Sequence, residues 1–599
     1  MTISANFPNV KPSLLLDFAN AQQLPPAVTF TRATTGAYYN GSTTAMAEQN
    51  LLTYSQEFDN AAWLLTNNSV VTANTTTAPD GTLTADTFSA TGSSTTTGTP
   101  TQVYKLVDGV NGLTYTASIF AKANTSNFVY FREYFSHNTE DVTWFNLSTG
   151  AVGTTSANHT ASIVSVGSGW YRCVITTTSN ATRNQSLGFG VSDANSNYNI
   201  TTSSSIYLWG AQFEQRSSVS AYTATTTQAI TNYNPVLLTA GGGQPRFDHN
   251  PTTSESLGLL IEEQRTNINT YSEAPATGGW SLTPASAVNN TIVSPAGTLT
   301  GASLTENGSF TYQRINRAFA ISAGTTFTVT VYAKKGLRDW IVLDSGPSAY
   351  YNLNTGTVGT VGAGATASMT SVGNGWYRCS YTYTESTTTL SVYIGASSNG
   401  TDGGYYTGVA GYQAFYFWGY QVEAASFPSS YIPTTTAAAT RAADVVSMSG
   451  ANFSSWYSPG NGTFYAEAST ASTASDVMIA EATNSSGAFL DFSLTFATTS
   501  TQFINRFVAS NNDVRGSGVV AANTMVKFSG SITNSSGTTL ASANGVAMTV
   551  STSQTLQTGA DRMFIGSRGG SSLFINAPIK KFAFYPAQLT QTQQNSITG

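Results

Sequence analysis

The sequence carries the same nine-residue stretch twice, and this duplication limits what the chain can fold into. SVGSGWYRC begins at Ser165, and SVGNGWYRC begins at Ser371. Flanking segments pair in the same order: TYTASIFAKA matches TFTVTVYAKK, and YLWGAQFEQ matches YFWGYQVEA. The period of about 210 residues exceeds that of solenoid repeats. We therefore predict a duplicated domain.

The shared segments have the alternation of β-strands, bounded by Gly, Asn, Ser or Thr. In WYRCVI, Tyr171, Cys173 and Ile175 share one face, which we predict to be core. Trp170 and Arg172 share the other face, where we expect the guanidinium to cover the indole. The stretch therefore predicts a strand, entered through a tight glycine turn, in each of two sister β-sandwiches.

The chain is too long for one hydrophobic core, so several domains are expected. After Asp444 the repeat ends and a third strand-rich region follows. We predict an all-β protein of tandem β-sandwich (jelly-roll) domains with a third sandwich at the C-terminus. The predicted boundaries are 1–45 for an N-terminal segment, 46–230 for the first jelly roll, 231–265 for a linker, 266–445 for the second jelly roll and 446–599 for the terminal sandwich.

Charged residues make up only 9% of the chain, and the net charge is −6 without a Lys/Arg run. This composition argues against nucleic acid or an anionic membrane as the partner. No apolar run approaches the ~20 residues of a membrane-spanning helix, and the first residues do not resemble a signal peptide. Cys173 and Cys379 occupy equivalent positions in separate domains, so we predict that both are reduced and buried.

Several motifs together resemble those of tailed-bacteriophage virion proteins of the head-spike and tail-fibre type, over roughly residues 10 to 450. They are NLLTYSQEFDNAAW, GWYRC, YLWGAQFEQ, SYIPTTTAAATRAADV, PSLLLDFA, FTRATTG and GLLIEEQRTN. The repeated units are similar to carbohydrate-binding-module jelly rolls. In the terminal region, GTFYAEA, ASANGVAMT and IKKFAFYPAQLT resemble a concanavalin A-like (laminin-G-type) domain.

The resemblance implies a fibre or spike subunit that binds host-surface glycans and belongs to the virion, assembled in the host cytoplasm and released by lysis. The N-terminal segment would dock to capsid, portal, neck or baseplate proteins, and a homotrimer is expected. No cofactor, metal, nucleic acid or membrane insertion is implied. Two alternatives stay open: a capsid decoration, cement or head-fibre protein without an essential receptor role, and a surface-polysaccharide depolymerase.

Glycans are recognised by aromatic faces and neutral hydrogen-bonding groups. If Tyr207 and Trp209 line the core, Gln212 and Glu214 look outward on the same strand. Packing of the fold is the alternative for the tryptophans, and an ordinary polar face is the alternative for the Gln and Glu residues. The candidate glycan-binding residues are Trp170, Trp376, Gln212, Glu214, Gln421, Glu423, Trp456, Tyr457 and Asn544.

Signs of catalysis are sparse. Glu133 lies near Glu140, Asp141 and His137 in a region where the second copy has only Asp344, which fits either a catalytic site or a solvated hairpin. The adjacent Glu262 and Glu263 would point to opposite faces of a strand. The three histidines lack metal-ligand spacing, and no GxSxG nucleophile motif occurs. We therefore predict no catalytic residue and no metal site.

Overall fold

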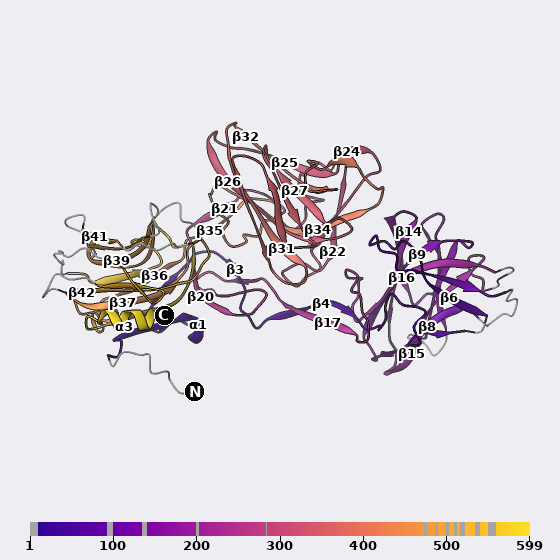
Figure 1. The fold of residues 1–599 in the computed structure, drawn as a ribbon, viewed down its shortest axis with the longest axis horizontal. Coiled ribbons are helices and arrows are strands. Elements are labelled where there is room, and N and C mark those ends of the chain that lie inside the picture. The colour runs from indigo at the N-terminus through magenta and orange to yellow at the C-terminus, as the bar shows by residue number, and fades with distance from the viewer. Residues whose placement is uncertain are drawn as a thin grey trace.

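A computed structural model shows a chain built almost entirely of β-strands and arranged in three lobes (Figure 1). It describes residues 10–66, 68–92, 100–134, 140–198, 200, 203–282, 284–471, 476–485, 489–497, 502–507, 512–515, 521–533, 540–548 and 559–599. Within these ranges the helices are short: α1 (Phe18–Ala21), α2 (Ala451–Ser454) and α3 (Gln591–Thr598). None of these described helices has the length and apolar character needed to cross a membrane. The predicted all-β fold class is confirmed.

The first copy is a sandwich of two six-stranded antiparallel sheets, at the right of Figure 1. One sheet, in the order β12-β11-β10-β15-β8-β5, contains β5 (Leu64–Leu65), β8 (Gln102–Gly109), β10 (Phe128–Glu133), β11 (Asp141–Asn146), β12 (Ala151–Thr155) and β15 (Arg183–Ser192). The other, in the order β13-β14-β9-β16-β7-β6, contains β6 (Ser69–Thr76), β7 (Ala85–Ala90), β9 (Thr114–Ala123), β13 (Thr160–Gly167), β14 (Trp170–Thr178) and β16 (Ser205–Glu214).

The second copy repeats this strand order. Its sheet β22-β23-β34-β26-β31-β30 contains β22 (Ser286–Ile292), β23 (Gly301–Thr305), β26 (Thr325–Lys335), β30 (Ala365–Ser371), β31 (Trp376–Glu385) and β34 (Gln413–Glu423). Its sheet β25-β32-β27-β28-β29 contains β25 (Arg314–Ala320), β27 (Trp340–Asp344), β28 (Ser348–Asn352), β29 (Thr357–Val361) and β32 (Thr389–Ser397). A separate pair joins β24 (Phe310–Tyr312) to β33 (Tyr405–Thr407).

The repeated stretch forms β14 and β31, each entered through a tight turn as predicted. In the first copy the two central turn residues, Ser168 and Gly169, have φ of 52° and 78°, which is the backbone of a type I′ hairpin. Asn374 and Gly375 occupy the same turn in the second copy, at 53° and 66°. The side of the strand that carries Cys173 faces the sandwich core, as the alternation predicts.

Both cysteines are buried and free in the two separate cores, as predicted. Burial raises the pKa of the Cys173 and Cys379 thiols well above their usual range, because the thiolate would lose its hydration. Neither side chain is therefore poised to react at neutral pH.

The third sandwich combines an eight-stranded and a seven-stranded sheet. The first contains β1 (Leu14–Asp17), β19 (Phe247–His249), β20 (Ser256–Ile261), β37 (Asn461–Ala468), β42 (Val526–Thr533), β43 (Ala541–Ala543), β44 (Val546–Ala547) and β46 (Ala577–Tyr585). The second contains β2 (Thr29–Thr31), β36 (Val445–Ser449), β38 (Val477–Thr483), β39 (Phe489–Ala497), β40 (Gln502–Phe507), β41 (Asn512–Arg515) and β45 (Arg562–Ile565).

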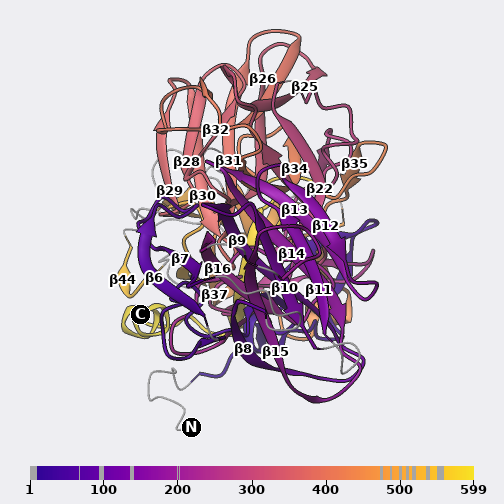
Figure 2. The ribbon, with the colours of Figure 1, turned by 90° about the vertical axis from the view of Figure 1, so that its right-hand side faces the viewer.

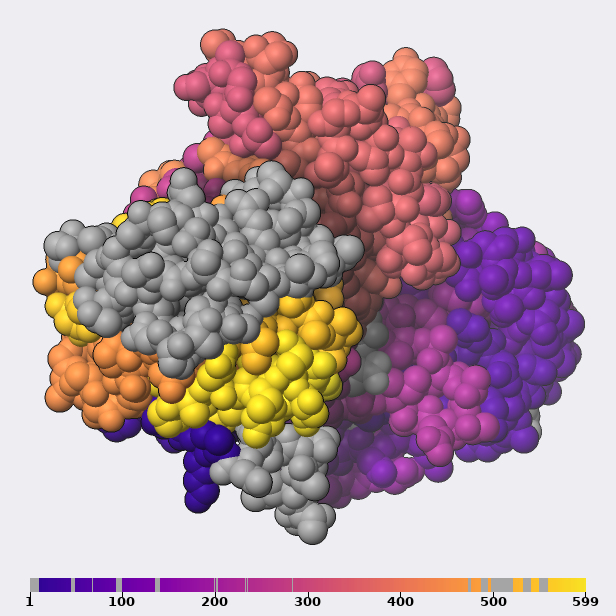
Figure 3. Space-filling view, turned by 60° about the vertical axis from the view of Figure 1, so that its left-hand side comes forward, coloured from indigo at the N-terminus to yellow at the C-terminus, as the bar shows by residue number. Residues whose placement is uncertain are grey.

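The structure corrects two of the predicted boundaries, because residues assigned to a separate N-terminal segment (1–45) and to a linker (231–265) complete the terminal sandwich. Leu14 pairs with Phe584 at the far end of the chain, and Leu259 pairs with Ile579. Figure 3 shows the indigo N-terminal residues lying against the yellow terminal sandwich. An apolar strand alone leaves its backbone groups and one face uncovered, so it is stable only beside partners that are remote in sequence.

Each duplicated sandwich is an insertion whose entry and exit strands pair with each other. The first copy is entered through β4 (Thr44–Asn50) and left through β17 (Ile230–Pro235), and the second through β21 (Arg265–Asn267) and β35 (Ala439–Arg441). We call the pair of β4 and β17 the ribbon. A further pair, β3 (Gly36–Tyr38) with β18 (Leu238–Ala240), continues the ribbon, as Figure 1 shows. The view of Figure 2 places the first copy in front and the second above it.

A buried ion network ties these insertions to the terminal sandwich. Asp444 accepts bonds from Arg32 at 2.8 Å and from Arg246 at 2.5 Å. Glu262 contacts Arg246 at 2.7 Å and Arg441 at 3.1 Å. The two neighbouring arginines hold the pKa of Glu262 down at about 2. Buried charges of this kind are tolerated only when they are paired.

Candidate functional site

The outer face of each sheet that carries the repeated stretch is covered by the segment that leaves the sandwich. We call these segments the exit straps, residues 215–225 in the first copy and 424–434 in the second. Arg172 Nη1 donates to the carbonyl oxygen of Ser220 at 2.7 Å, and Arg378 Nη2 makes the equivalent bond at 2.5 Å. The arginine of the repeated stretch therefore holds the strap.

The expectation that Gln212 and Glu214 look out to solvent is wrong, because both are fully buried beneath the strap. Glu214 Oε1 accepts from the backbone N–H of Ser220 at 2.8 Å, and Gln212 Oε1 accepts from that of Thr223 at 2.7 Å. These side chains point away from the core, but they bond to the chain itself. The second copy repeats both bonds through Gln421 and Glu423, which are also fully buried.

The expected contact between the arginine and the indole is also wrong. Arg172 lies over Phe120, its neighbour across the strand pair, at 5.2 Å from the ring centroid. Arg378 lies over Tyr332 in the same way, at 5.7 Å. Trp170 retains 1% exposure and Trp376 retains 2%, so neither indole offers a face to a ligand. Packing, the alternative left open for these tryptophans, is what the structure shows.

The candidates of the terminal sandwich are also engaged inside the protein. Trp456 is buried and packs edge-on against Phe584 at 5.4 Å between ring centroids, and Tyr457 contacts the same ring at 5.5 Å. Asn544 occupies a hairpin turn with φ of 45°, and its Oδ1 accepts from the backbone N–H of Lys527. The surface that could meet a ligand therefore lies elsewhere.

An exposed cluster of aromatic rings stands at one edge of the second copy, on β24 and β33. Phe310 is 64% exposed, Tyr405 43% and Tyr312 41%. The ring centroid of Tyr405 lies 4.7 Å from that of Phe310 and 4.8 Å from that of Tyr312, with steeply inclined planes. Large rings gathered at the surface in this way are typical of a binding site.

Arg314 connects this cluster to the outer face of the sheet β25-β32-β27-β28-β29. Its guanidinium lies 3.7 Å from the ring centroid of Tyr312 and 3.9 Å from that of Tyr393, and Nη1 pairs with Asp344 at 3.1 Å. We call Phe310, Tyr312, Arg314, Tyr393 and Tyr405 the aromatic platform. It combines apolar rings with a cation and an adjacent carboxylate, so it can pack against a ligand and hydrogen-bond to it.

The first copy lacks the two central members of the platform. By strand register, Gln102 stands in place of Arg314 and Gly188 in place of Tyr393. A Cβ at Gly188 would lie 2.7 Å from Gln102 Oε1, which leaves no room for a ring there. The rings on this face of the first copy pack against one another and are largely buried: Tyr130, Trp144 and Tyr198.

Sequence reasoning missed the platform, although one signal was present. Phe310 and Tyr312 alternate about Thr311 in a segment where the first copy has SSTTTGTP, which contains no aromatic residue, and Tyr405 lies far along the chain. The matched motifs drew attention to shared residues, whereas the platform consists of residues that differ between the copies.

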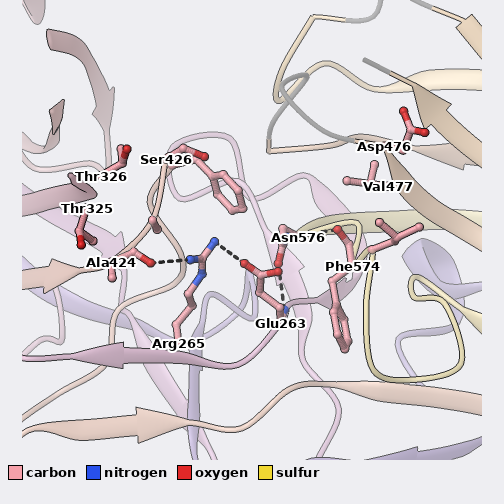
Figure 4. Close-up of a pocket in the computed structure, with 13 residues that line it drawn as sticks. Glu263, Arg265, Thr325, Thr326, Ala424, Ser426, Asp476, Val477, Phe574 and Asn576 are labelled. Atoms are coloured by element: carbon pink, nitrogen blue, oxygen red, sulfur yellow. Dashed lines mark hydrogen bonds and ion pairs between the residues drawn. The ribbon is translucent and has the colours of Figure 1, made fainter. Parts of the chain in front are cut away.

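A cleft of about 480 Å³ separates the second copy from the terminal sandwich (Figure 4). On its floor Glu263 and Arg265 form an ion pair, and Arg265 Nη1 donates to the carbonyl oxygen of Ala424 at 3.1 Å. The guanidinium also lies over Phe427, and Asn576 Oδ1 accepts from the N–H of Glu263. These hydrogen bonds reach Ala424 of the second copy and Asn576 of the terminal sandwich, so the residues on the floor of the cleft help to join the two lobes.

The adjacent Glu262 and Glu263 lie between β20 and β21 rather than on a strand, and their side chains have different surroundings. Glu263 lines the cleft, whereas Glu262 belongs to the buried ion network. These two carboxylates therefore do not share a site.

The acids near Glu133 are bound to separate partners rather than paired with each other. Glu133 Oε1 lies 2.9 Å from His159 Nε2, and His159 Nδ1 lies 2.8 Å from the hydroxyl of Thr143. Glu140 pairs with Arg132 at the surface. Asp141 accepts from Ser156 and Asn158, and His137 lies outside the described residues.

The relay Glu133–His159–Thr143 resembles an acid, base and hydroxyl in series, but Glu133 and Thr143 are fully buried and give no access to a substrate. Within the described ranges, no three His, Cys, Asp or Glu side chains gather in a way that could hold a metal ion.

No family model matches the chain, and no curated protein matches it. Among solved structures, it is similar to the CBM40 of the Ruminococcus gnavus IT-sialidase bound to α2,3-sialyllactose, at 14% identity and TM-score 0.22, covering 25% of this chain and 87% of that one. It is similar to the tandem CBM22 domains of Paenibacillus barcinonensis Xyn10C at 13% identity and TM-score 0.19, covering 64% and 100%. It is similar to Trypanosoma rangeli sialidase with the inhibitor DANA at 8% identity and TM-score 0.21, covering 96% and 99%. Scores this low carry no argument about function.

Proposed function

We propose that the protein is a glycan-binding adhesin whose sugar-binding surface is the aromatic platform of the second copy. The observation that carries the proposal is the exposure of Phe310, Tyr312 and Tyr405 as one contiguous cluster. Sugar rings present apolar C–H faces, which pack on aromatic rings, and hydroxyl groups, which bond to charged and amide side chains. Arg314 and Asp344 supply such polar groups beside the rings.

The test is a glycan microarray probed with the full chain, followed by titration of the best glycan. Tyr405→Ala and Tyr312→Ala should each weaken binding by about 10-fold, since an aromatic contact contributes on the order of 1 kcal/mol. Tyr233→Ala is the matched control, because Tyr233 is 61% exposed on the distant ribbon strand β17. Equal binding by all three variants, or no glycan bound by the wild type, would contradict the proposal.

We further propose that the adhesin is a fibre or spike subunit of a bacteriophage virion, which is supported by the sequence motifs alone. Because β1 and β2 belong to the terminal sandwich, attachment to other virion proteins is assigned to that sandwich rather than to a free N-terminal arm. A homotrimer and release by lysis stay predictions of the same resemblance.

Immunogold labelling of purified particles with antibody against residues 460–599 tests this location. Gold on the tail or its base supports a receptor-binding fibre. Gold on the capsid would instead support the decoration-protein alternative, and unlabelled particles would remove the virion assignment while leaving glycan binding to stand.

A further inference from the structure

A second cavity, of about 470 Å³, lies where three parts of the molecule meet. One wall is the strap-bearing face of the second copy, with Tyr332, Arg378 and Ser380. The others come from the ribbon and the segment leading to β20, including Tyr39 and Asp248, and from the terminal sandwich. This volume is within the range of small-molecule sites in proteins and suits one or two sugar rings.

Two polar groups at this cavity lack partners in the folded chain. The phenol oxygen of Tyr39, a side chain 93% buried, has no hydrogen-bond partner among the described residues, and the same holds for Arg378 Nε. Tyr39, Tyr332, Asp248 and Arg378 all line this cavity, so the four side chains form one cluster. A buried polar group without a partner destabilises the folded chain, because it has lost its hydration without gaining a hydrogen bond.

Asp248 is the carboxylate of this cluster, and it has no ion pair among the described residues. Its Oδ1 accepts from the backbone N–H of Tyr39 at 2.8 Å. Loss of hydration on burial raises its pKa to about 6, while the hydrogen bond to Tyr39 opposes that rise. Its carboxyl oxygens have lone pairs that can accept hydroxyl donors.

We propose that this junction cavity is a second ligand site, which takes a single neutral pyranose or a polyol of similar size. Asp248 would accept ligand hydroxyls, while the Tyr39 hydroxyl and the Arg378 guanidinium, whose unpartnered atoms are covered in this fold, would turn toward the cavity to donate to ligand oxygens. Tyr332 and Tyr431, which also line the cavity, offer ring surface. The choice of ligand class rests on the proposed function, whereas the site itself rests on the cavity and its unpartnered groups.

The charges around the cavity favour a neutral ligand. Asp248 and Arg378 have opposite signs, Glu255 is paired with Lys580 at 2.5 Å, and Glu262 is held by its arginines. The lining therefore carries charges of both signs rather than a cluster of one sign, which singles out neither an anion nor a cation. A ligand with many hydroxyl groups satisfies both donors and acceptors without burying a charge of its own.

The site is peculiar to the second copy, although both copies carry the same arginine. At the positions of Tyr332 and Ser380 the first copy has Phe120 and Val174, which have no hydroxyl groups. The duplication therefore provides a matched control at every position of this sheet.

Saturation-transfer difference NMR on the full chain tests the proposal. The probes are the methyl α-pyranosides of glucose, galactose and mannose. Ser368→Trp places a large side chain at an exposed residue that lines the cavity, and Ser162→Trp places the same side chain at the equivalent exposed residue of the first copy. Asp248→Asn keeps an acceptor for the Tyr39 N–H but removes the charge.

The cavity variants are made in a Tyr405→Ala background, so that sugar bound at the platform contributes little signal. In that background we expect at least one glycoside to show saturation transfer that Ser368→Trp abolishes and Asp248→Asn weakens at least 10-fold, while Ser162→Trp leaves it unchanged. Transfer to none of the three probes, or transfer that Ser368→Trp retains, would overturn the proposal. A wild-type signal that Tyr405→Ala alone removes would also overturn it, while supporting glycan binding at the platform.

Discussion

The two duplicated sandwiches share their internal contacts and differ in what they present to the outside. Both use the arginine of the repeated stretch and the Gln-x-Glu of the last sheet strand to hold an exit strap. Only the second has Arg314 and Tyr393 on its outer sheet, where the first has Gln102 and Gly188. Matching residues thus mark what holds this fold together, and differing residues mark where it can bind.

The copies also differ in their attachment. The first copy is connected through a two-stranded ribbon and packs against the second copy, where Leu337 lies on the cluster of Trp170 and Trp209. The second copy also packs beside the terminal sandwich, across the cleft of Figure 4 and the buried ion network. The second copy is therefore placed to form sites with the rest of the chain.

The largest expected effect comes from breaking the ion network. Asp444→Asn removes the carboxylate shared by Arg32 and Arg246, so buried guanidinium groups lose their partner. We expect a loss of about 3 to 5 kcal/mol in the free energy of unfolding of the terminal sandwich. Hydrogen-exchange mass spectrometry reports each lobe separately, and the first copy should exchange as before. Equal loss of protection in both copies would contradict the difference in attachment.

A smaller, pH-dependent effect belongs to the first copy alone. Buried Asp86 accepts from the N–H groups of Phe58 and Asn74, yet loss of hydration raises its pKa to about 6, and the second copy has Ala302 at this position. The folded state then holds its proton more tightly than the unfolded state, so stability falls as pH rises from about 4 to 6.

In Asp86→Asn the fall in the free energy of unfolding between pH 4 and pH 7 should be smaller by about 1 to 2 kcal/mol. The variant should also be less stable at every pH by the contribution of one lost hydrogen bond. The measurement is denaturant unfolding of both proteins at pH 4 and pH 7. A difference in free energy between them that stays constant with pH would refute the assignment.

The glutamates that hold the two exit straps, Glu214 and Glu423, differ in one hydrogen bond. Glu423 Oε2 accepts from the Ser429 hydroxyl at 2.8 Å, whereas Glu214 Oε2 has no partner among the described residues. Glu423→Gln should therefore lower the free energy of opening its strap by about 1 kcal/mol more than Glu214→Gln does. Limited proteolysis within each strap measures the local opening. The prediction is wrong if Glu214→Gln increases cleavage of the first strap more than Glu423→Gln increases cleavage of the second.

The smallest effect concerns the single difference within the repeated stretch. Ser168 and Asn374 both adopt positive φ, and Asn tolerates this backbone better than Ser. Ser168→Asn should stabilise the first copy by about 0.5 kcal/mol, and Asn374→Ser should destabilise the second similarly, with the added loss of a contact from Lys334. Thermal unfolding of the reciprocal pair checks the opposite signs.

The strands of the repeat and their core faces could be predicted because alternation is a local property. Cys173 and Ile175 lie in the core as their spacing indicates. Exposure of the opposite face could not be predicted, since it depends on what covers it. Gln212 and Glu214 have the pattern of solvent-facing residues and are nevertheless buried, because the strap folds back over them.

By itself the sequence determined the all-β class, the duplication, the turn that enters each repeated strand and the burial of both cysteines. Only the tertiary structure decided that Leu14 pairs beside Phe584, and that Arg314, Tyr393 and Tyr405 form one surface. The physical reason is that strand pairing satisfies backbone groups equally well with near and distant partners. Which faces are finally covered is therefore set by the whole chain.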